Sequence, residues 1–339
     1  MKIMQAIGGA GHGGAETFFV SLAGAFHRAG HEQLLTMRAN DVRRAQLEEQ
    51  GLSPIELKFG GRFDFRTKSR LQKLANDFKP EVFISWMSRA SQVTPSGDFL
   101  KLARHGGYYK IKNFRKCDHI VANTEEICQT IVEQGWPQEK THYIPNFIRW
   151  RGAPPVSRAS LDTPNEATVL LSLGRLHQNK AMDTALHVLK KLDHCYLWIG
   201  GTGALQADLE KLAEDLGVSD RVRFLGWRTD KEALFAAADI CLYPSRIEPF
   251  GNVTLDAWAS GTPIVAAASA GPAAYIRHEK NGLLCEIDHV EEMADRVQTL
   301  IDNPTFATEL ASCGKAEFES KFTEQAAVQN WVNLFERLA

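Results

Sequence analysis

The sequence predicts an α/β protein with two domains, each built on a doubly wound parallel sheet of the Rossmann type. Three observations support this fold class. The chain has 339 residues, more than a single hydrophobic core usually serves. Short apolar runs alternate with helical patterns along its whole length, as in parallel strands joined by helices. A segment rich in proline and small polar residues, 149–167, separates two such series.

The first series predicts the amino-terminal domain, 1–150. A helix is expected between the first two strands, because apolar residues recur at helical spacing from Ala15 to Ala29 and Gly30 then provides a stop signal. The expected strands lie at 2–7, 33–37, 81–86, 119–123 and 142–146.

The second series predicts the carboxy-terminal domain, 151–322, followed by a helix over 323–339. That helix carries an apolar stripe, so it needs a partner, and we expect it to pack back on the first domain. The expected strands of this domain lie at 168–174, 196–201, 222–226, 240–245 and 263–268.

Composition excludes several other classes of protein. Hydrophobic residues make up 44% and charged residues 24%, which is typical of globular proteins and unlike disordered or fibrous ones. No apolar run reaches the length of a membrane span, and the apolar start is too short for a signal peptide, so we expect a cytoplasmic protein. The six cysteines form no C-x-x-C pair, which indicates free thiols and neither disulfides nor a zinc ribbon.

A glycine cluster, 8–14, lies between the first strand and the first helix, where backbone N–H groups can approach an anion. It satisfies G-x-G-x-x-G, but a nicotinamide dinucleotide site needs an acidic residue after the second strand, where Arg38 and Asn40 stand. Contact with an anion or sugar phosphate is therefore favoured, and a merely tight turn is the alternative. His12, in this cluster, and His177 face either ligand or water.

The second domain carries two cations around one strand-to-helix turn. Arg175 and Lys180 follow the strand at 168–174, and together they suit a diphosphate, with solvated loop charges as the alternative. The next strand ends in a second glycine loop that contains Gly201 and Gly203, so it too offers bare backbone to a ligand.

Two carboxylates follow the strand at 240–245. Glu248 precedes a glycine turn, and Asp256 lies eight residues later on the next helix. Carboxylates bind sugar hydroxyls, while the N–H groups of Gly251, Asn252 and Val253 at the helix start suit phosphate oxygens.

These motifs identify a family. The series GGAE, GRLHQNK, GGTG, RVRFLGW, PSRIEPFGNVTLDAWASGTPIVA and NGLLCE resembles the family 4 retaining glycosyltransferases of the GT-B fold, of the bacterial lipopolysaccharide or glycolipid type. The resemblance covers essentially the whole chain. It implies two Rossmann-like domains facing a cleft, with the acceptor on the first and the nucleotide sugar on the second.

The resemblance also implies roles for individual residues. Arg175 and Lys180 would neutralise the diphosphate, Glu248 would meet the transferred sugar, and Asp256 would bind the ribose. His105 matches the amino-terminal histidine of the family near the donor sugar. The other expected donor contacts are Gly13, Gly14, Gly201, Gly203, Phe250, Gly251, Asn252 and Val253.

Three departures from the family pattern stand out. Asp256 replaces the usual glutamate and is one methylene shorter, so the ribose contact would be looser or bridged by water. The motif that normally ends in an acidic residue reads 270–274 without one, and Ala181 replaces the glycine after Lys180. These departures leave the diphosphate contacts intact and the donor sugar open.

The predicted reaction is sugar transfer from a nucleotide diphospho-sugar, with a UDP-sugar favoured, to a saccharide or glycolipid acceptor. No D-x-D triplet occurs, so we expect neither a metal nor another cofactor, with cations and helix N-termini stabilising the leaving diphosphate. The resemblance implies retention by a front-face mechanism. A nucleotide-sugar epimerase and a catalytically lapsed binding module are the alternatives.

The net charge of −2 hides an asymmetry, +6 for residues 1–150 and −8 for the remainder. Two stretches, 58–73 and 101–116, combine six cations each with aromatic residues, which suits an anionic membrane or glycolipid. An ordinary solvated face is the alternative. Nucleic acid is disfavoured, because no reader motif occurs and the isoelectric point is about 6.6. Trp86, Arg89, Arg104 and Tyr108 are candidates for an acceptor pocket or for ordinary packing.

Overall fold

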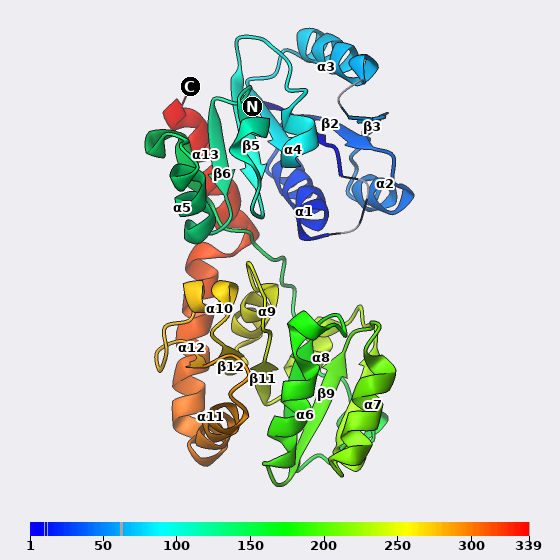
Figure 1. Ribbon diagram of the computed structural model, residues 1–339, viewed down its shortest axis with the longest axis vertical. Coiled ribbons are helices and arrows are strands. Elements are labelled where there is room, and N and C mark those ends of the chain that lie inside the picture. The colour runs from blue at the N-terminus through cyan, green and yellow to red at the C-terminus, as the bar shows by residue number, and fades with distance from the viewer. Residues whose placement is uncertain (10, 12, 62–63, 339) are drawn as a thin grey trace. The chain divides into compact units, whose positions relative to one another are not determined.

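The computed structural model describes residues 1–9, 11, 13–61 and 64–338, and it divides into two compact units (Figure 1). Unit 1 comprises Met1–Phe147 together with Glu324–Ala339, and unit 2 comprises Ile148–Thr323. No helix among the described residues is long and apolar enough to cross a membrane.

Unit 1 is built on a seven-stranded sheet in the order β3-β2-β1-β4-β5-β6-β7. Every neighbouring pair is parallel, and Ile3 of β1 lies between Gln33 of β2 and Val82 of β4. The strands are β1 Lys2–Ile7, β2 Glu32–Arg38, β3 Ile55–Leu57, β4 Val82–Trp86, β5 Leu100–His105, β6 His119–Ala122 and β7 Thr141–Tyr143.

The helices of unit 1 connect these strands, as parallel pairing requires. The α-helices are α1 Gly14–Arg28, α2 Asp41–Glu48, α3 Phe65–Phe78, α4 Met87–Ser91, α5 Glu125–Glu133 and α13 Glu324–Leu338, and the short 3₁₀ turns are η1 Ile111–Phe114 and η2 Gln138–Lys140.

The carboxy-terminal helix α13 belongs to unit 1 because its apolar stripe packs on α1. Trp331 and Phe335 are fully buried, and both rings contact Phe26 of α1, at centroid distances of 6.3 and 6.0 Å. Arg28 of α1 also forms an ion pair with Glu324 at 2.6 Å. Helix α1 therefore covers the stripe that the sequence leaves without a partner.

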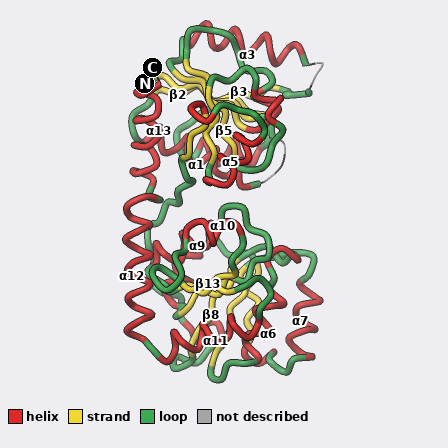
Figure 2. Tube along the Cα trace, turned by 60° about the vertical axis from the view of Figure 1, so that its left-hand side comes forward, coloured by secondary structure: helices red, strands yellow, loops and turns green. Residues whose placement is uncertain are grey.

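Unit 2 is built on a six-stranded parallel sheet in the order β10-β9-β8-β11-β12-β13. Its central strands are apolar on both faces, and helices enclose the strands of each sheet (Figure 2). The strands are β8 Thr168–Leu173, β9 Cys195–Gly200, β10 Val222–Gly226, β11 Ile240–Tyr243, β12 Ile264–Ala267 and β13 Leu283–Cys285.

The helices of unit 2 likewise alternate with its strands along the chain. They are α6 Met182–Lys190, α7 Gln206–Asp215, α8 Lys231–Ala237, α9 Asn252–Ser260, α10 Ala270–Tyr275, α11 Val290–Asp302 and α12 Pro304–Lys321, with 3₁₀ turns η3 Arg158–Leu161, η4 Gln178–Lys180 and η5 Ser219–Arg221.

The fold confirms the predicted class, two parallel-sheet α/β domains. Each of the ten strands expected from the apolar runs is present, although the last one in unit 1 is shorter and earlier than expected, at Thr141–Tyr143. The apolar runs do not predict three of the strands. β3 and β13 have three residues each, too few to show a period, and the apolar residues of β5 are interrupted by Lys101 and Arg104. All six cysteines are free, and Cys313 is exposed while Cys128 is half-buried.

Candidate functional site

The predicted ligand loops of unit 2 share one edge of its sheet. The glycine-flanked loops after β8 and β9 are hydrogen-bonded to each other, and the loop after β11 reaches them through the amide of Arg246, which donates to the carbonyl of Asn179 at 2.9 Å. Parallel strands place their carboxyl ends together, so these loops meet although they lie far apart in the sequence.

Glu248 is held by three donors at this edge. Lys180 forms an ion pair with its carboxylate, the Tyr243 hydroxyl donates to Oε2 at 2.7 Å, and the Gly251 amide donates to Oε1 at 3.3 Å. Burial, followed by the charge of Glu248, raises the pKa of Tyr243 well above its usual value, so this hydroxyl stays protonated. The structure therefore brings together Lys180 and Glu248, which the sequence assigns to different parts of the same donor.

The start of α9 offers backbone donors beside Glu248. Gly251 precedes the helix with φ of +85°, in the left-handed region that favours glycine, and it has no side chain to cap the first turn. The amides of Asn252 and Val253 open the helix, where its dipole is positive. The hydroxyl of Thr254, in the same turn, is buried and has no hydrogen-bond partner among the described residues. This turn is equipped to bind an anion.

Gly201 and Gly203 pack against the loop after β8. A Cβ on Gly201 would lie 1.9 Å from the carbonyl oxygen of Gly174, and one on Gly203 would lie 2.2 Å from that of Leu176. The amide of Leu176 also donates to the carbonyl of Thr202 at 3.0 Å. These glycines are thus required for the close approach of two loops, a reason that the sequence does not reveal.

Phe250 points into the core of unit 2. Its buried ring packs against Tyr275 at a centroid distance of 5.3 Å, so only its backbone is available to a ligand. Gly271, from the motif that lacks an acidic residue, lies against it. A Cβ on Gly271 would lie 2.5 Å from the carbonyl carbon of Phe250, and its amide donates to the carbonyl of Glu248 at 2.6 Å.

Asp256 is buried and paired. Lys231 of α8 donates to its Oδ1 at 2.6 Å and lies 6.0 Å from the ring centroid of Trp150. Burial raises the pKa of the Asp256 carboxyl, and Lys231 acts against that rise. The Asp256 carboxylate is therefore already paired with Lys231, and the sequence contains no sign of this pair.

Arg246 fastens the loops of this edge together. Its guanidinium donates to Asp183 at 2.6 Å, to Asp288 at 2.7 Å and to the carbonyl of Gln178 at 2.9 Å. The two carboxylates raise its pKa. Arg175, by contrast, is exposed, and among the described residues it has no side-chain hydrogen bond or ion pair. Its guanidinium is available, but the structure does not direct it at Glu248 or Lys180.

The glycine cluster of unit 1 leads into α1, which begins at Gly14 and has no side-chain cap at Gly13. Both glycines are exposed. Arg43 of α2 is buried beneath the cluster, where its guanidinium donates to the carbonyls of Gly9 at 3.1 Å and Gly11 at 3.0 Å. His12 lies outside the described residues. The sequence does not single out Arg43, since its partners lie more than 30 residues away.

His105 ends β5 with a fully buried ring, in a contact of 4.0 Å between centroids with Phe114. Neither ring nitrogen has a hydrogen-bond partner among the described residues. Burial lowers its pKa to about 3, so the ring is neutral. Its expected contact with a donor sugar stays a prediction. Trp86 and Arg104 are buried as well: Trp86 donates to Gln5 at 3.0 Å, and Arg104 donates to the carbonyl of Ile144 at 2.7 Å.

The two basic stretches contribute to one face of unit 1. Gln72 of α3 donates to the carbonyl of Ser96 at 2.7 Å, and Gln92 donates to Asn113 of η1 at 2.9 Å, so α3 and η1 flank the segment 92–96. Within the described part of the chain, nine exposed cations of these stretches have no ion pair: Lys58, Arg66, Lys68, Arg70, Lys73, Lys110, Lys112, Arg115 and Lys116. We call this set the basic face.

Two further observations describe the basic face. Burial and then the charge of Lys68 lower the pKa of Lys116, which indicates that the two stretches approach each other. Phe65 is 72% exposed at the start of α3. Residues 62–63 of the first stretch lie outside the described residues, and Arg104 of the second is buried.

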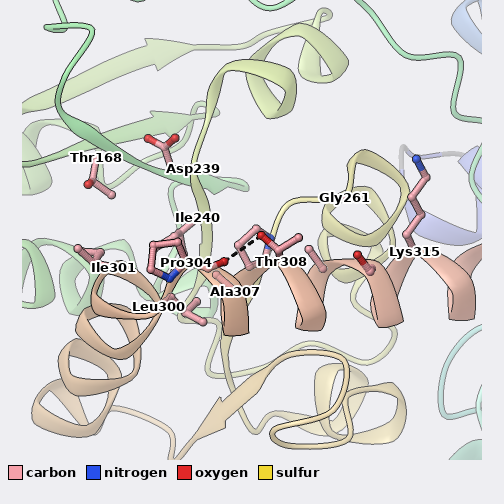
Figure 3. A pocket seen from close by; sticks show the side chains of 13 residues that line it. Thr168, Asp239, Ile240, Gly261, Leu300, Ile301, Pro304, Ala307, Thr308 and Lys315 are labelled. Carbon is pink, nitrogen blue, oxygen red and sulfur yellow. Dashed lines mark hydrogen bonds between the residues drawn. The ribbon is translucent and has the colours of Figure 1, made fainter.

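A pocket of about 470 Å³ lies at the opposite edge of the unit 2 sheet (Figure 3). Thr168 and Ile240, which begin β8 and β11, line it together with α12, and Lys315 lies at one end. Because it is formed at the amino ends of the strands, it is not part of the loop cluster around Glu248.

This fold, with ligand loops at the carboxyl edge of each sheet, defines the class of protein as a two-domain glycosyltransferase of the GT-B type. Residues 12–149 match the model of Glycosyltransferase Family 4, and residues 155–317 match that of Glycosyl transferases group 1. The chain is 35% identical over 333 residues to the lipopolysaccharide core biosynthesis glycosyltransferase LpsE of Rhizobium meliloti, covering 95% of each chain. It therefore belongs to the family 4 glycosyltransferases.

A second relative agrees with this assignment, and two solved structures share the fold. A second Rhizobium meliloti protein, the lipopolysaccharide core biosynthesis glycosyltransferase LpsD, is 32% identical and covers 99% of this chain and 98% of its own. Among solved structures, Anabaena Alr3699/HepE in complex with UDP superimposes with a TM-score of 0.84 at 20% identity, over 99% of this chain and all of that one. The lipopolysaccharide outer core galactosyltransferase WaaB superimposes with a TM-score of 0.76 at 18% identity, over 99% of this chain and all of its own.

Proposed function

We propose that this glycosyltransferase moves a sugar, with retention of configuration and without a metal, from a nucleotide diphospho-sugar to a saccharide or glycolipid acceptor of the cell envelope. A UDP-sugar is the favoured donor. The observation that carries the proposal is the cluster of Lys180, Glu248 and the uncapped start of α9 at Gly251. In this cluster a cation and helix amides can bind a diphosphate, and a carboxylate can bind sugar hydroxyls.

The relatives support both halves of the proposal. The two Rhizobium meliloti relatives are named for lipopolysaccharide core biosynthesis, which favours an acceptor of that class. Solved structures of Anabaena Alr3699/HepE contain UDP or UDP-glucose, which favours a uridine nucleotide.

In the proposed mechanism, negative charge grows on the leaving diphosphate while the sugar becomes oxocarbenium-like. Lys180, Arg175 and the amides of Asn252 and Val253 would stabilise that charge, which is the task that a metal performs in enzymes that have one. Glu248, held by three donors, would accept hydrogen bonds from the transferred sugar. The leaving phosphate would help to deprotonate the acceptor, since no nucleophile is assigned on the far face of the sugar.

The donor is tested first by binding. Thermal unfolding would be followed with UDP-glucose, GDP-mannose, ADP-glucose and dTDP-glucose, because a ligand of the folded state raises the unfolding temperature by mass action. Transfer from the stabilising donor to truncated lipopolysaccharide would then be followed by mass spectrometry, and the anomeric configuration of the product by NMR. A gain of one sugar residue with the donor's configuration is expected. An inverted product would refute retention, and loss of activity with chelator that metal restores would refute metal independence.

Variants test the site itself. Lys180→Ala and Arg175→Ala are expected to lower kcat about 100- to 1000-fold with the fold intact, because each removes a charge from the leaving group. Lys190→Ala, an exposed cation of α6, is the matched control and should retain wild-type kcat. Near-normal turnover by both site variants would refute the assignment. Formation of an epimerised donor in the absence of acceptor would indicate an epimerase. Donor binding without any turnover would indicate a lapsed binding module.

We further propose that the basic face meets the anionic surface on which a lipid-linked acceptor resides. Nine exposed cations without ion pairs favour such a surface, since each cation near anionic lipid contributes about 1 kcal/mol. The protein is expected to co-sediment with vesicles that contain phosphatidylglycerol. The bound fraction should fall as salt is added, and it should also be lower for the double variant Lys68→Glu/Lys116→Glu. Lys190→Glu, in unit 2, is the control. Binding that ignores lipid charge and salt would refute this part.

A further inference from the structure

Arg43 binds the backbone of the glycine cluster of unit 1. The side chain rises from α2, whose first turn is capped by Asn40, the acceptor for the Arg43 amide at 2.9 Å. The two terminal nitrogens of its guanidinium each bind one carbonyl of the cluster, that of Gly9 at 3.1 Å and that of Gly11 at 3.0 Å. One planar fork thus binds two alternate residues of the loop.

The direction of these carbonyls matters because the cluster lies between β1 and the start of α1. A peptide group can turn either its N–H or its carbonyl oxygen to a ligand, and the oxygen repels an anion. Glycines turn easily, so their sequence alone does not determine which group faces outward. With two oxygens bound to Arg43, the uncapped start of α1 at Gly13 faces a ligand without those negative dipoles beside it.

The guanidinium is well placed for this task. Arg43 is only 3% exposed, so its guanidinium is shielded from water on most sides. Burial lowers the pKa of Arg43, while the charge of Glu16, from the first turn of α1, acts against that. A Cβ on Gly9 would lie 2.4 Å from a carboxylate oxygen of Glu16, and one on Gly13 would lie 2.9 Å from the other, so that carboxylate lies close to both glycines.

We propose that Arg43 is a positioning residue for the donor: by binding the carbonyls of Gly9 and Gly11, it keeps the glycine cluster in the form that accepts the phosphate-linked sugar. The inference rests on the proposed function, since it assumes that this cluster contacts the nucleotide sugar. Arg43 acts through the loop and touches no reacting atom. It is absent from the motifs of the sequence because α2 reaches the cluster only in the folded unit.

Two variants of Arg43 and two of its neighbour test the inference. Arg43→Lys keeps the charge but lacks the fork, and Arg43→Met keeps most of the stem but no donor. Arg44 is the matched control, because it lies on the same helix but is 41% exposed and pairs with Glu56 and not with the cluster. The measurements are KM and kcat for the donor that supports transfer in the panel above, with acceptor saturating, and the unfolding temperature.

We expect the donor KM to rise about tenfold in Arg43→Lys and further in Arg43→Met, with smaller changes in kcat. Arg44→Lys and Arg44→Met should keep the wild-type KM. A wild-type donor KM in folded Arg43→Lys would overturn the inference. The inference would also be overturned if KM stayed unchanged while kcat fell only in proportion to the loss of folded protein, because a purely structural role gives that result. If Arg43→Met does not fold, Arg43→Lys decides. If the wild-type protein turns over no nucleotide sugar, the proposed function fails and the inference with it.

Discussion

The pair Lys231 and Asp256 permits a sharp test of how the donor region of unit 2 is stabilised. The two side chains are unequally buried, since that of Asp256 is 7% exposed and that of Lys231 is 39% exposed. Removing one partner of a buried pair costs about 3–5 kcal/mol, because the other charge remains buried. Because Lys231 is partly solvated, we expect Lys231→Met to lower the free energy of unfolding by about 2 kcal/mol. For a domain of this size, that lowers the unfolding temperature by about 4–8 °C.

A matched control exists in the same unit. Lys191 is 40% exposed and pairs with Glu291 at 2.5 Å, but Glu291 is 68% exposed. Lys191→Met should therefore cost less than about 0.5 kcal/mol, because both charges stay solvated. Asp256→Asn should lower the free energy of unfolding less than Lys231→Met does. It leaves Lys231 unpaired, and water can reach that side chain. Calorimetry on the single variants and on Lys231→Met/Asp256→Asn completes a double-mutant cycle.

The pH dependence of the Lys231→Met effect adds a second, independent readout. The pKa of Asp256 is raised in the folded protein by burial, and loss of Lys231 would raise it further. An acid with a raised folded pKa gives stability that is present below its unfolded pKa and lost as pH rises through the folded value. The difference in free energy of unfolding between wild type and Lys231→Met should thus be largest at high pH, where Asp256 is charged in both proteins. It should shrink as pH falls and the carboxyl of the variant becomes protonated. A gap that is independent of pH, or equal effects of the two lysine variants, would refute the reasoning.

Three further predictions concern the same edge of unit 2. Gly201→Ala should lower the free energy of unfolding by about 3 kcal/mol or more, because its Cβ would lie 1.9 Å from a carbonyl oxygen. Gly217→Ala, where a Cβ meets open space, should lower it by about 1 kcal/mol. Similar unfolding temperatures for the two variants would contradict this prediction. Ala181→Gly should raise stability by about 1 kcal/mol, since φ is +53° there, and a lower unfolding temperature would count against it. Tyr243→Phe removes one donor from Glu248 and should lower kcat about tenfold at unchanged stability; wild-type kcat would show that the hydroxyl is dispensable.

Much of the fold could be predicted because its signals are local. Apolar runs of four to six residues between helical patterns predict β1 and β8 directly, since each run is itself the buried strand. The sequence did not predict β3 and β13 because they have three residues each and are placed only by pairing with β2 and β12. It did not predict β5 because Lys101 and Arg104 interrupt its apolar residues, and the strand is placed by pairing with β4 and β6.

The site was predictable in part. Lys180 and Glu248 were expected to act at the same ligand, and they form an ion pair. Residue type did not reveal orientation, however: Phe250 turns its ring into the core, and His105 is enclosed by aromatic rings. The partner Tyr243 was missed because a tyrosine at the end of an apolar strand looks like any core residue.

The sequence by itself determined the class of protein and its family, because strand and helix periods, glycine turns and the order of charged motifs are properties of neighbouring residues. Only the tertiary structure decided which charges meet. Arg246 joins Asp183 and Asp288, which lie 63 and 42 residues away, and Arg43 binds carbonyls more than 30 residues away. These partners come together because the strand order of each sheet differs from the order of the chain, so contacts across the sheet leave no local trace in the sequence.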